Sequence, residues 1–106
     1  MTDSGKLSPE GQRAIELFQE QLDNMPIVRN YSGITPEFCQ WKDSTTGLFK
    51  KYLPTSPHYN RFSIVQFGSA HETHQRYLRG CDLAEQCIRG AIHDIERFDL
   101  QLPGDA

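Results

Sequence analysis

The segment Ser69–Cys81, SAHETHQRYLRGC, contains side chains that could bind a metal ion. His71 and His74 are three positions apart, and Cys81 follows seven positions after the second histidine. On one helix these side chains would share a side, and a His/His/Cys set is suited to zinc. The spacing nevertheless differs from the HExxH zinc motif, no fourth ligand is evident, and Cys81 also fits an apolar stripe. We therefore expect no metal or other cofactor, and we interpret both histidines as exposed residues of a capped first helical turn.

Thiol chemistry is the next possibility, because the sequence has three cysteines and no CxxC pair. An odd number of free thiols fits a reducing compartment. A catalytic cysteine needs a base and a lowered pKa, which Cys39 could acquire near a helix N-terminus if His58 or His74 approached it. No nucleophile motif surrounds Cys39 or Cys87, so we expect a protein that is not an enzyme. A small metal or thiol enzyme using His71, His74 and a cysteine stays as a further alternative.

Carboxylates and phosphate-binding loops give weaker signals. Asp94, Glu96 and Asp99 do not share a face as general acid–base catalysis requires, so we interpret them, with Arg97, as a solvated side. The sequence has no glycine-rich phosphate loop, and the single glycine of FGSAHE precedes only a predicted helix start. Neither feature predicts a catalytic site.

Basic residues are the more suggestive group. Two lysines end the second long predicted helix, one arginine lies in a short helix, and two arginines share one face of the last helix. If the second and last helices are neighbours, five residues form one patch for phosphate, a nucleotide or an acidic partner: Lys50, Lys51, Arg61, Arg76 and Arg79. The alternative is that the lysines complement a helix dipole and the arginines flank the core.

Length and charge restrict the class of protein. The chain has 106 residues, enough for a single domain over 1–106 with an ordered part from about 8 to 100 and short flexible ends. Its net charge of -3 argues against a sequence-independent nucleic-acid binder. No apolar run approaches the roughly 20 residues of a membrane span, and the N-terminus lacks the apolar region of a secretory signal. We expect a cytoplasmic protein.

Helix starts predict an all-α fold. A hydroxyl residue can accept a hydrogen bond from an unpaired helix N–H, and a following proline loses no bond at that position. This pattern, or the related S-x-x-E capping box, occurs at Ser8-Pro9, Thr35-Pro36, Ser56-Pro57 and Ser69–Glu72. Apolar residues then recur at steps of three and four, as on one face of a helix.

The predicted architecture is a small antiparallel bundle of three main helices and one short helix at about 57–63. Asn24 and Pro26 should end the first helix, and the segment 24–35 should be a loop whose Ile27, Val28 and Ile34 tuck onto the core. Pro54 should end the second helix. The last helix should be the longest, and FSIVQF before it could be extended.

Glycines and aromatic residues leave two questions open. Gly47, Gly80 and Gly90 lie inside predicted helices, where each costs about 1 kcal/mol relative to alanine. Close approach of another backbone would explain them, and a bend is the rival explanation. Phe38 and Trp41 belong to the predicted core. Four further aromatic residues could either pack on the core or mark a partner surface: Tyr31, Tyr52, Tyr59 and Phe62.

The middle of the chain, PEFCQWKDSTTGLFKKYLPTSPHYNRF, followed by YLRGCDLAEQCIRGAIHDIE, resembles a helical accessory domain of bacterial proteins. Such domains often precede TIR-like or other nucleotide-related effector modules in defence-type proteins. The likeness covers roughly residues 10–98 and rests on a W-K pair, the pattern SPxYxRF and the glycine at Gly80. It implies a recognition or assembly domain and supplies no catalytic residues.

The leading functional hypothesis is therefore a non-enzymatic domain that works through contact with a protein partner or with itself. The alternative is a regulatory module that senses a nucleotide or phosphate on the same basic residues.

Overall fold

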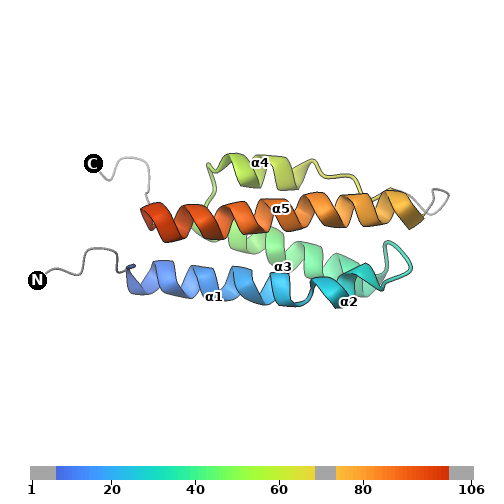
Figure 1. Cartoon of the computed structure of the whole chain (residues 1–106), viewed down its shortest axis with the longest axis horizontal. Helices are drawn as coiled ribbons and strands as arrows, with labels where there is room; N and C mark the ends of the chain where they lie inside the picture. Colours follow the sequence, from blue (N-terminus) through green and yellow to red (C-terminus); the bar gives the residue numbers. More distant parts are fainter. Residues whose placement is uncertain (1–6, 69–73, 101–106) are drawn as a thin grey trace, which may run out of the picture.

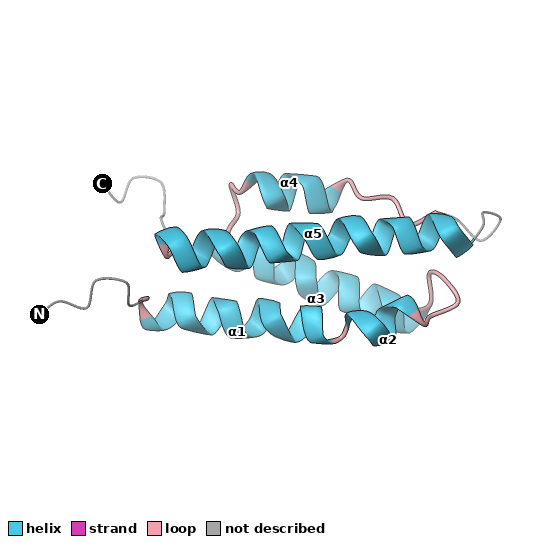
Figure 2. Cartoon of the chain, viewed as in Figure 1, coloured by secondary structure: helices cyan, strands magenta, loops and turns pink. Residues whose placement is uncertain are grey.

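The computed structural model describes residues 7–68 and 74–100, and helices account for most of them. Five helices follow one another along the chain: α1 (Pro9–Asp23), α2 (Met25–Arg29), α3 (Pro36–Tyr52), α4 (Pro57–Ser63) and α5 (His74–Phe98). No strand occurs within these two ranges (Figure 2). The predicted all-α class is confirmed, and α5 is the longest helix, as expected.

Three helices begin where the capping pattern predicts. The hydroxyls of Ser8, Thr35 and Ser56 accept hydrogen bonds from backbone N–H groups two or three residues further along, in the first turns of α1, α3 and α4. The proline that follows each cap also occupies the first turn, where its missing N–H costs no helical bond. The fourth predicted start, Ser69–Glu72, lies outside the described residues.

The segment after α1 differs from the predicted loop, because it contains α2. Pro26 lies in the first turn of this helix, so it starts a new helix after Asn24 has capped the old one. Proline is tolerated in a first turn, which is why the same residue type can follow one helix and open the next. Val28 is buried as predicted, whereas Ile27 and Ile34 are 56% and 53% exposed, contrary to the prediction.

The three long helices and the short α4 lie side by side. α1 and α4 run in one direction, and α3 and α5 run in the other (Figure 1). α1 packs against both α3 and α5, and α4 packs against α3 and α5 from the other side. Rings fill the space between them: Phe18 meets Phe49 edge-to-face at 4.9 Å between ring centres, and Phe38 meets Phe67 at 4.7 Å. The core is thus largely aromatic.

The aromatic residues of uncertain role belong to the core or its edge. Phe62 is fully buried and Tyr52 nearly so. Tyr59 stacks on Phe49 with ring centres 5.7 Å apart, and Tyr31 is half-buried against the core. All four rings therefore pack on the core or at its edge, which is the first of the two alternatives. Phe38 and Trp41 are buried, as predicted.

The three glycines that the sequence placed inside helices have three different surroundings. A Cβ on Gly80 would lie 2.8 Å from the Gln66 carbonyl oxygen and 3.0 Å from Phe67 Cα, so close approach of a backbone explains this glycine. At Gly90 the neighbour is instead a side chain, since a Cβ would lie 2.5 Å from the His58 ring. Gly47 has nothing within 4 Å of that position, so close approach does not explain it.

The two ends of the described chain are tied together by Asp99. Its carboxylate accepts hydrogen bonds from the Ser8 backbone N–H and hydroxyl, both at 2.9 Å. Burial favours the neutral acid, but hydrogen bonds from Ser8 and Leu100 outweigh it and hold the pKa of Asp99 below its ordinary value. Asp99 is therefore a structural contact between helix ends, which corrects its interpretation as part of a solvated side.

We expect Gly80→Ala and Gly47→Ala to change stability in opposite directions. The first should lower the free energy of unfolding by about 1–3 kcal/mol, because backbone atoms of residues 66–67 must move to admit the methyl group. The second should raise it by up to about 1 kcal/mol, because alanine is the better helix former in open space. Urea unfolding followed by circular dichroism measures both, and equal effects would contradict the assigned contact.

Candidate functional site

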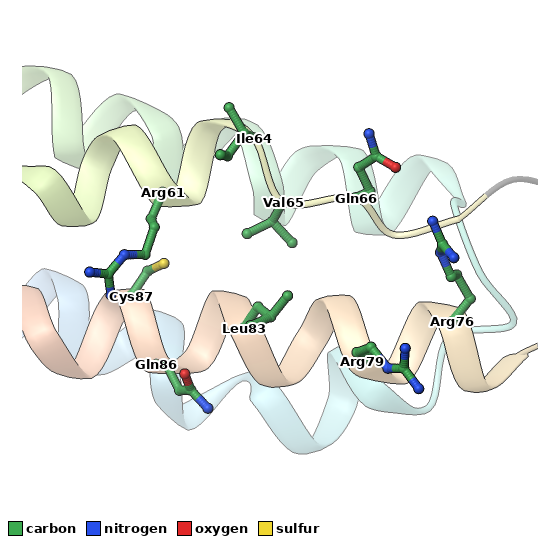
Figure 3. Close-up of a pocket in the computed structure, with 9 residues that line it drawn as sticks. All are labelled: Arg61, Ile64, Val65, Gln66, Arg76, Arg79, Leu83, Gln86 and Cys87. Atoms are coloured by element: carbon green, nitrogen blue, oxygen red, sulfur yellow. The ribbon is translucent and has the colours of Figure 1, made fainter.

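A groove of about 410 Å³ runs between the N-terminal half of α5 and the end of α4 with the segment that follows it (Figure 3). Its described lining combines apolar side chains, three arginines and two amides: Arg61, Ile64, Val65, Gln66, Arg76, Arg79, Leu83, Gln86 and Cys87. This volume falls in the range of small binding pockets, roughly 300–1,000 Å³.

The groove exists because α4 is short. It ends at Ser63 after about two turns, and residues 65–68 continue without helical structure alongside α5. Phe67 anchors this segment in the core, and Gly80 lets its backbone approach α5. The prediction that FSIVQF is extended is wrong for Phe62 and Ser63, which belong to α4, and residues 65–67 are neither helix nor strand.

Apolar side chains form the centre of the groove. Ile64 is 74% exposed and Leu83 is 44% exposed, although both are large aliphatic residues. Val65 and Leu83 extend into the space between the segment and α5 in Figure 3. Cys87 is buried at the end near Arg61. Ile64 on one wall and Leu83 on the other thus present apolar surface that the described part of the chain leaves exposed.

Arginines stand at both ends of this apolar centre. Arg76, Arg79 and Leu83 are spaced by three and four residues on α5, so they follow one side of the helix. Arg61 reaches from α4 to the opposite end, beside Cys87 (Figure 3). None of the described lining residues is acidic, although the whole chain has a net charge of -3. Among the described residues, no acid forms an ion pair with Arg61 or Arg79.

The acids of this part of α5 are held on a neighbouring strip of the helix by other arginines. Arg29 of α2 pairs with Asp82 at 2.6 Å and with Glu85 at 2.8 Å. Arg89 also pairs with Glu85, at 2.8 Å. The hydrogen bond from Arg29 is the main reason why the pKa of Glu85 lies below its ordinary value, against the opposing effect of burial. This network was not foreseen, because it depends on α2.

Three of the five predicted patch residues meet in the groove, namely Arg61, Arg76 and Arg79. Lys50 and Lys51 are not among the residues that line it and lie instead in the last turn of α3. The condition behind the five-residue patch was direct packing of the second and last long helices, but α3 packs chiefly on α1 and α4. The Lys51 ammonium lies 5.1 Å from the centre of the Tyr52 ring.

The candidate metal and thiol residues do not assemble into a site in the described part of the chain. No group of three His, Cys, Asp or Glu side chains there could hold a metal ion, and His71 lies outside the described residues. His74 stacks on Tyr77 with ring centres 5.5 Å apart. Burial raises the pKa of the Cys81 and Cys87 thiols, which disfavours the nucleophilic thiolate. Cys39 is exposed.

His58 has a structural role that the sequence did not reveal. Its Nε2 lies 3.0 Å from an Asp94 oxygen, and its ring rests on Gly90. Asp94 therefore contacts α4, which corrects its interpretation as merely solvated. Nδ1 of His58 is buried and has no hydrogen-bond partner among the described residues. The His58–Asp94 pair joins the first turn of α4 to α5.

Comparison of the chain with family models, with curated proteins and with solved structures finds no match. The resemblance to bacterial accessory domains is thus an expectation from the sequence, and function has to be argued from geometry. Within the described ranges, no helix is both long and apolar enough to cross a membrane.

The Arg29–Glu85 contact predicts a pH-dependent contribution to stability. Because the native pKa of Glu85 is lowered, its contribution should be complete above the ordinary value of 4.5 and should disappear as the pH falls through the native value. Glu85→Gln should therefore lower the free energy of unfolding by about 0.5–1 kcal/mol at neutral pH and by less near pH 3. Urea unfolding at both pH values measures this, with Glu16→Gln of the exposed Arg13–Glu16 pair as control. A loss that is the same at both pH values would contradict the assignment.

The burial of two thiols predicts their reactivity. In the native protein at pH 8, a disulfide reagent should modify Cys39 rapidly and Cys81 and Cys87 slowly, because the last two are buried and their pKa values are raised. Denaturation should make all three thiols react. In the Cys39→Ser variant the fast phase should be missing, and a fast phase that persists would show that a thiol assigned to the core is accessible.

Proposed function

We propose that this protein is a non-enzymatic interaction domain and that the arginine-flanked groove is its binding surface. The observation that carries the proposal is the joint exposure of Ile64 and Leu83 between the arginines at the two ends of the groove. Aliphatic side chains exposed together in a hollow, with polar groups at the rim, are typical of a surface that is covered by a partner. The resemblance to accessory domains of bacterial defence proteins favours the same class of function.

The arrangement of the reactive groups supports the absence of catalysis in this proposal. Cys81 and Cys87 are buried in the core, and His58 is engaged by Asp94. No described nucleophile lies within reach of a described base in the groove, since Cys87 is the only thiol among its described lining residues and no histidine is. A surface with arginines, amides and aliphatic side chains binds and orients, but supplies no proton transfer at neutral pH.

A nucleotide- or phosphate-sensing role is the second candidate, because three guanidinium groups line one hollow. Guanidinium forks suit phosphate oxygens. Ile64, Val65 and Leu83 favour the interaction role instead, since a phosphate gains nothing from an aliphatic floor and would leave it uncovered. The groove also extends along α5 for more than the one helical turn that separates Arg79 from Leu83. It is therefore longer than a single phosphate group.

Affinity capture with matched variants tests the proposed function. The immobilised wild-type chain should retain a specific protein from an extract of its native cells, and Leu83→Glu should retain at least about tenfold less of it. Ile34→Glu is the matched control, because Ile34 is similarly exposed but does not line the groove. Quantitative mass spectrometry measures the retained protein, and circular dichroism confirms that each variant folds.

Retention of the same proteins by wild type and Leu83→Glu would count against the groove as the binding surface. A thermal-shift series with inorganic phosphate and nucleoside triphosphates tests the second candidate function, which is nucleotide or phosphate sensing. A rise in the unfolding temperature that Arg79→Ala abolishes would favour anion sensing over protein contact.

A further inference from the structure

From the order of charges and apolar groups, we infer that the groove receives an amphipathic helix of a partner protein, with aliphatic side chains bounded by acidic residues at both ends. The inference rests on the proposed function and specifies the chemistry of the partner. The order along the groove is arginine, aliphatic, arginine: Arg76 and Arg79 at one end, Leu83 with Val65 and Ile64 in the centre, and Arg61 at the other end (Figure 3).

The charge of the lining determines the charge of the occupant. Every charged side chain among the described lining residues is a guanidinium, while the acids Asp82 and Glu85 are held on the neighbouring strip by Arg29. An occupant with positive charge would meet only like charges among the described lining residues. Carboxylates can accept two parallel hydrogen bonds from one guanidinium, which makes an acidic segment the complementary partner.

The spacing along α5 determines where the acids of the partner should lie. Arg79 precedes Leu83 by four residues, and Cys87, beside Arg61, follows Leu83 by four residues. The charges therefore lie about one helical turn, roughly 6 Å, to either side of the apolar centre. A complementary segment carries one or two aliphatic anchors, with an acidic residue about one turn before them and another about one turn after them.

A helix matches this surface better than an extended peptide does. The long wall of the groove is α5, whose backbone N–H and C=O groups are bonded within the helix, so it offers no edge for strand pairing. A helical partner satisfies its own backbone and presents side chains at intervals of one turn. Those intervals equal the spacing of Arg79, Leu83 and Cys87, because both elements have the same pitch.

A display selection with a defined peptide library tests the inference and does not require the partner to be identified first. The library consists of helical peptides of about 16 residues, rich in alanine and glutamine, with one face varied among Asp, Lys, Ser and Leu. Peptides are selected on the full chain and counter-selected on Leu83→Glu, a variant of a partly exposed residue. Enriched peptides should carry leucines at helical spacing with aspartates on both sides.

Fluorescence anisotropy with one enriched peptide then tests which basic residues of the protein bind the acidic residues of the peptide. Arg61→Ala and Arg79→Ala should each weaken binding about fivefold, and added salt should weaken it further. Lys50→Ala and Lys51→Ala are matched controls, because they remove one positive charge outside the groove. Their affinities should equal that of the wild type.

Three results would overturn the inference. Peptides with lysine or serine at the flanking positions would reject the acidic partner, and no enrichment over Leu83→Glu would reject a helical one. A dimer seen by light scattering that Leu83→Glu dissociates would assign the groove to a second copy of this chain. If a native protein still binds through Leu83 while selected peptides lack aspartate, only the chemistry of the occupant fails and the proposed function stands.

Discussion

The close approach between Gly80 and the backbone of residues 66–67 is the contact on which the proposed binding groove depends. It holds the segment after α4 against α5, and the buried Phe67 ring secures that segment in the core. A methyl group at this position would push the two backbones apart, because the Gln66 carbonyl oxygen and Phe67 Cα lie beside it with the Phe67 ring, and these backbone atoms cannot rotate away. Because α4 is short, its last residues and the segment that follows them form one wall of a groove. The other wall is α5.

The second organising feature is the separation of charge around α5. One strip of this helix faces the core, a second carries acids that pair with Arg29 and Arg89, and a third carries Arg76 and Arg79 of the groove. Because Asp82 and Glu85 are engaged on their own strip, they are not available to neutralise Arg79. A chain with a net negative charge thereby keeps only positive charge among the described lining residues of the groove, which would orient the acidic partner that we propose.

Several side chains with catalytic potential have structural roles in the described part of the chain. Cys81 and Cys87 fill small spaces in the core, and Asp99 accepts hydrogen bonds that connect the start of α1 to the end of α5. His58 and Asp94 join α4 to α5. The residue types alone therefore suggested more chemistry than their surroundings support, since burial raises the pKa of the two buried thiols and an acid already engages the imidazole. Binding is therefore the function that we propose for the exposed groups of the groove.

The sequence by itself determined the class of fold and the starts of α1, α3 and α4, because a cap, a proline and apolar residues at steps of three and four act within a few residues of one another. The sequence could not show that Gly80 has a close backbone neighbour and Gly47 has none, or that Arg61 lines the groove and Lys50 does not. Both differences depend on which helices are neighbours. It also missed α2, since a proline that follows a cap can end one helix or open another. Only the tertiary structure decided that three arginines border one apolar hollow, because that grouping arises from packing between residues far apart in the chain.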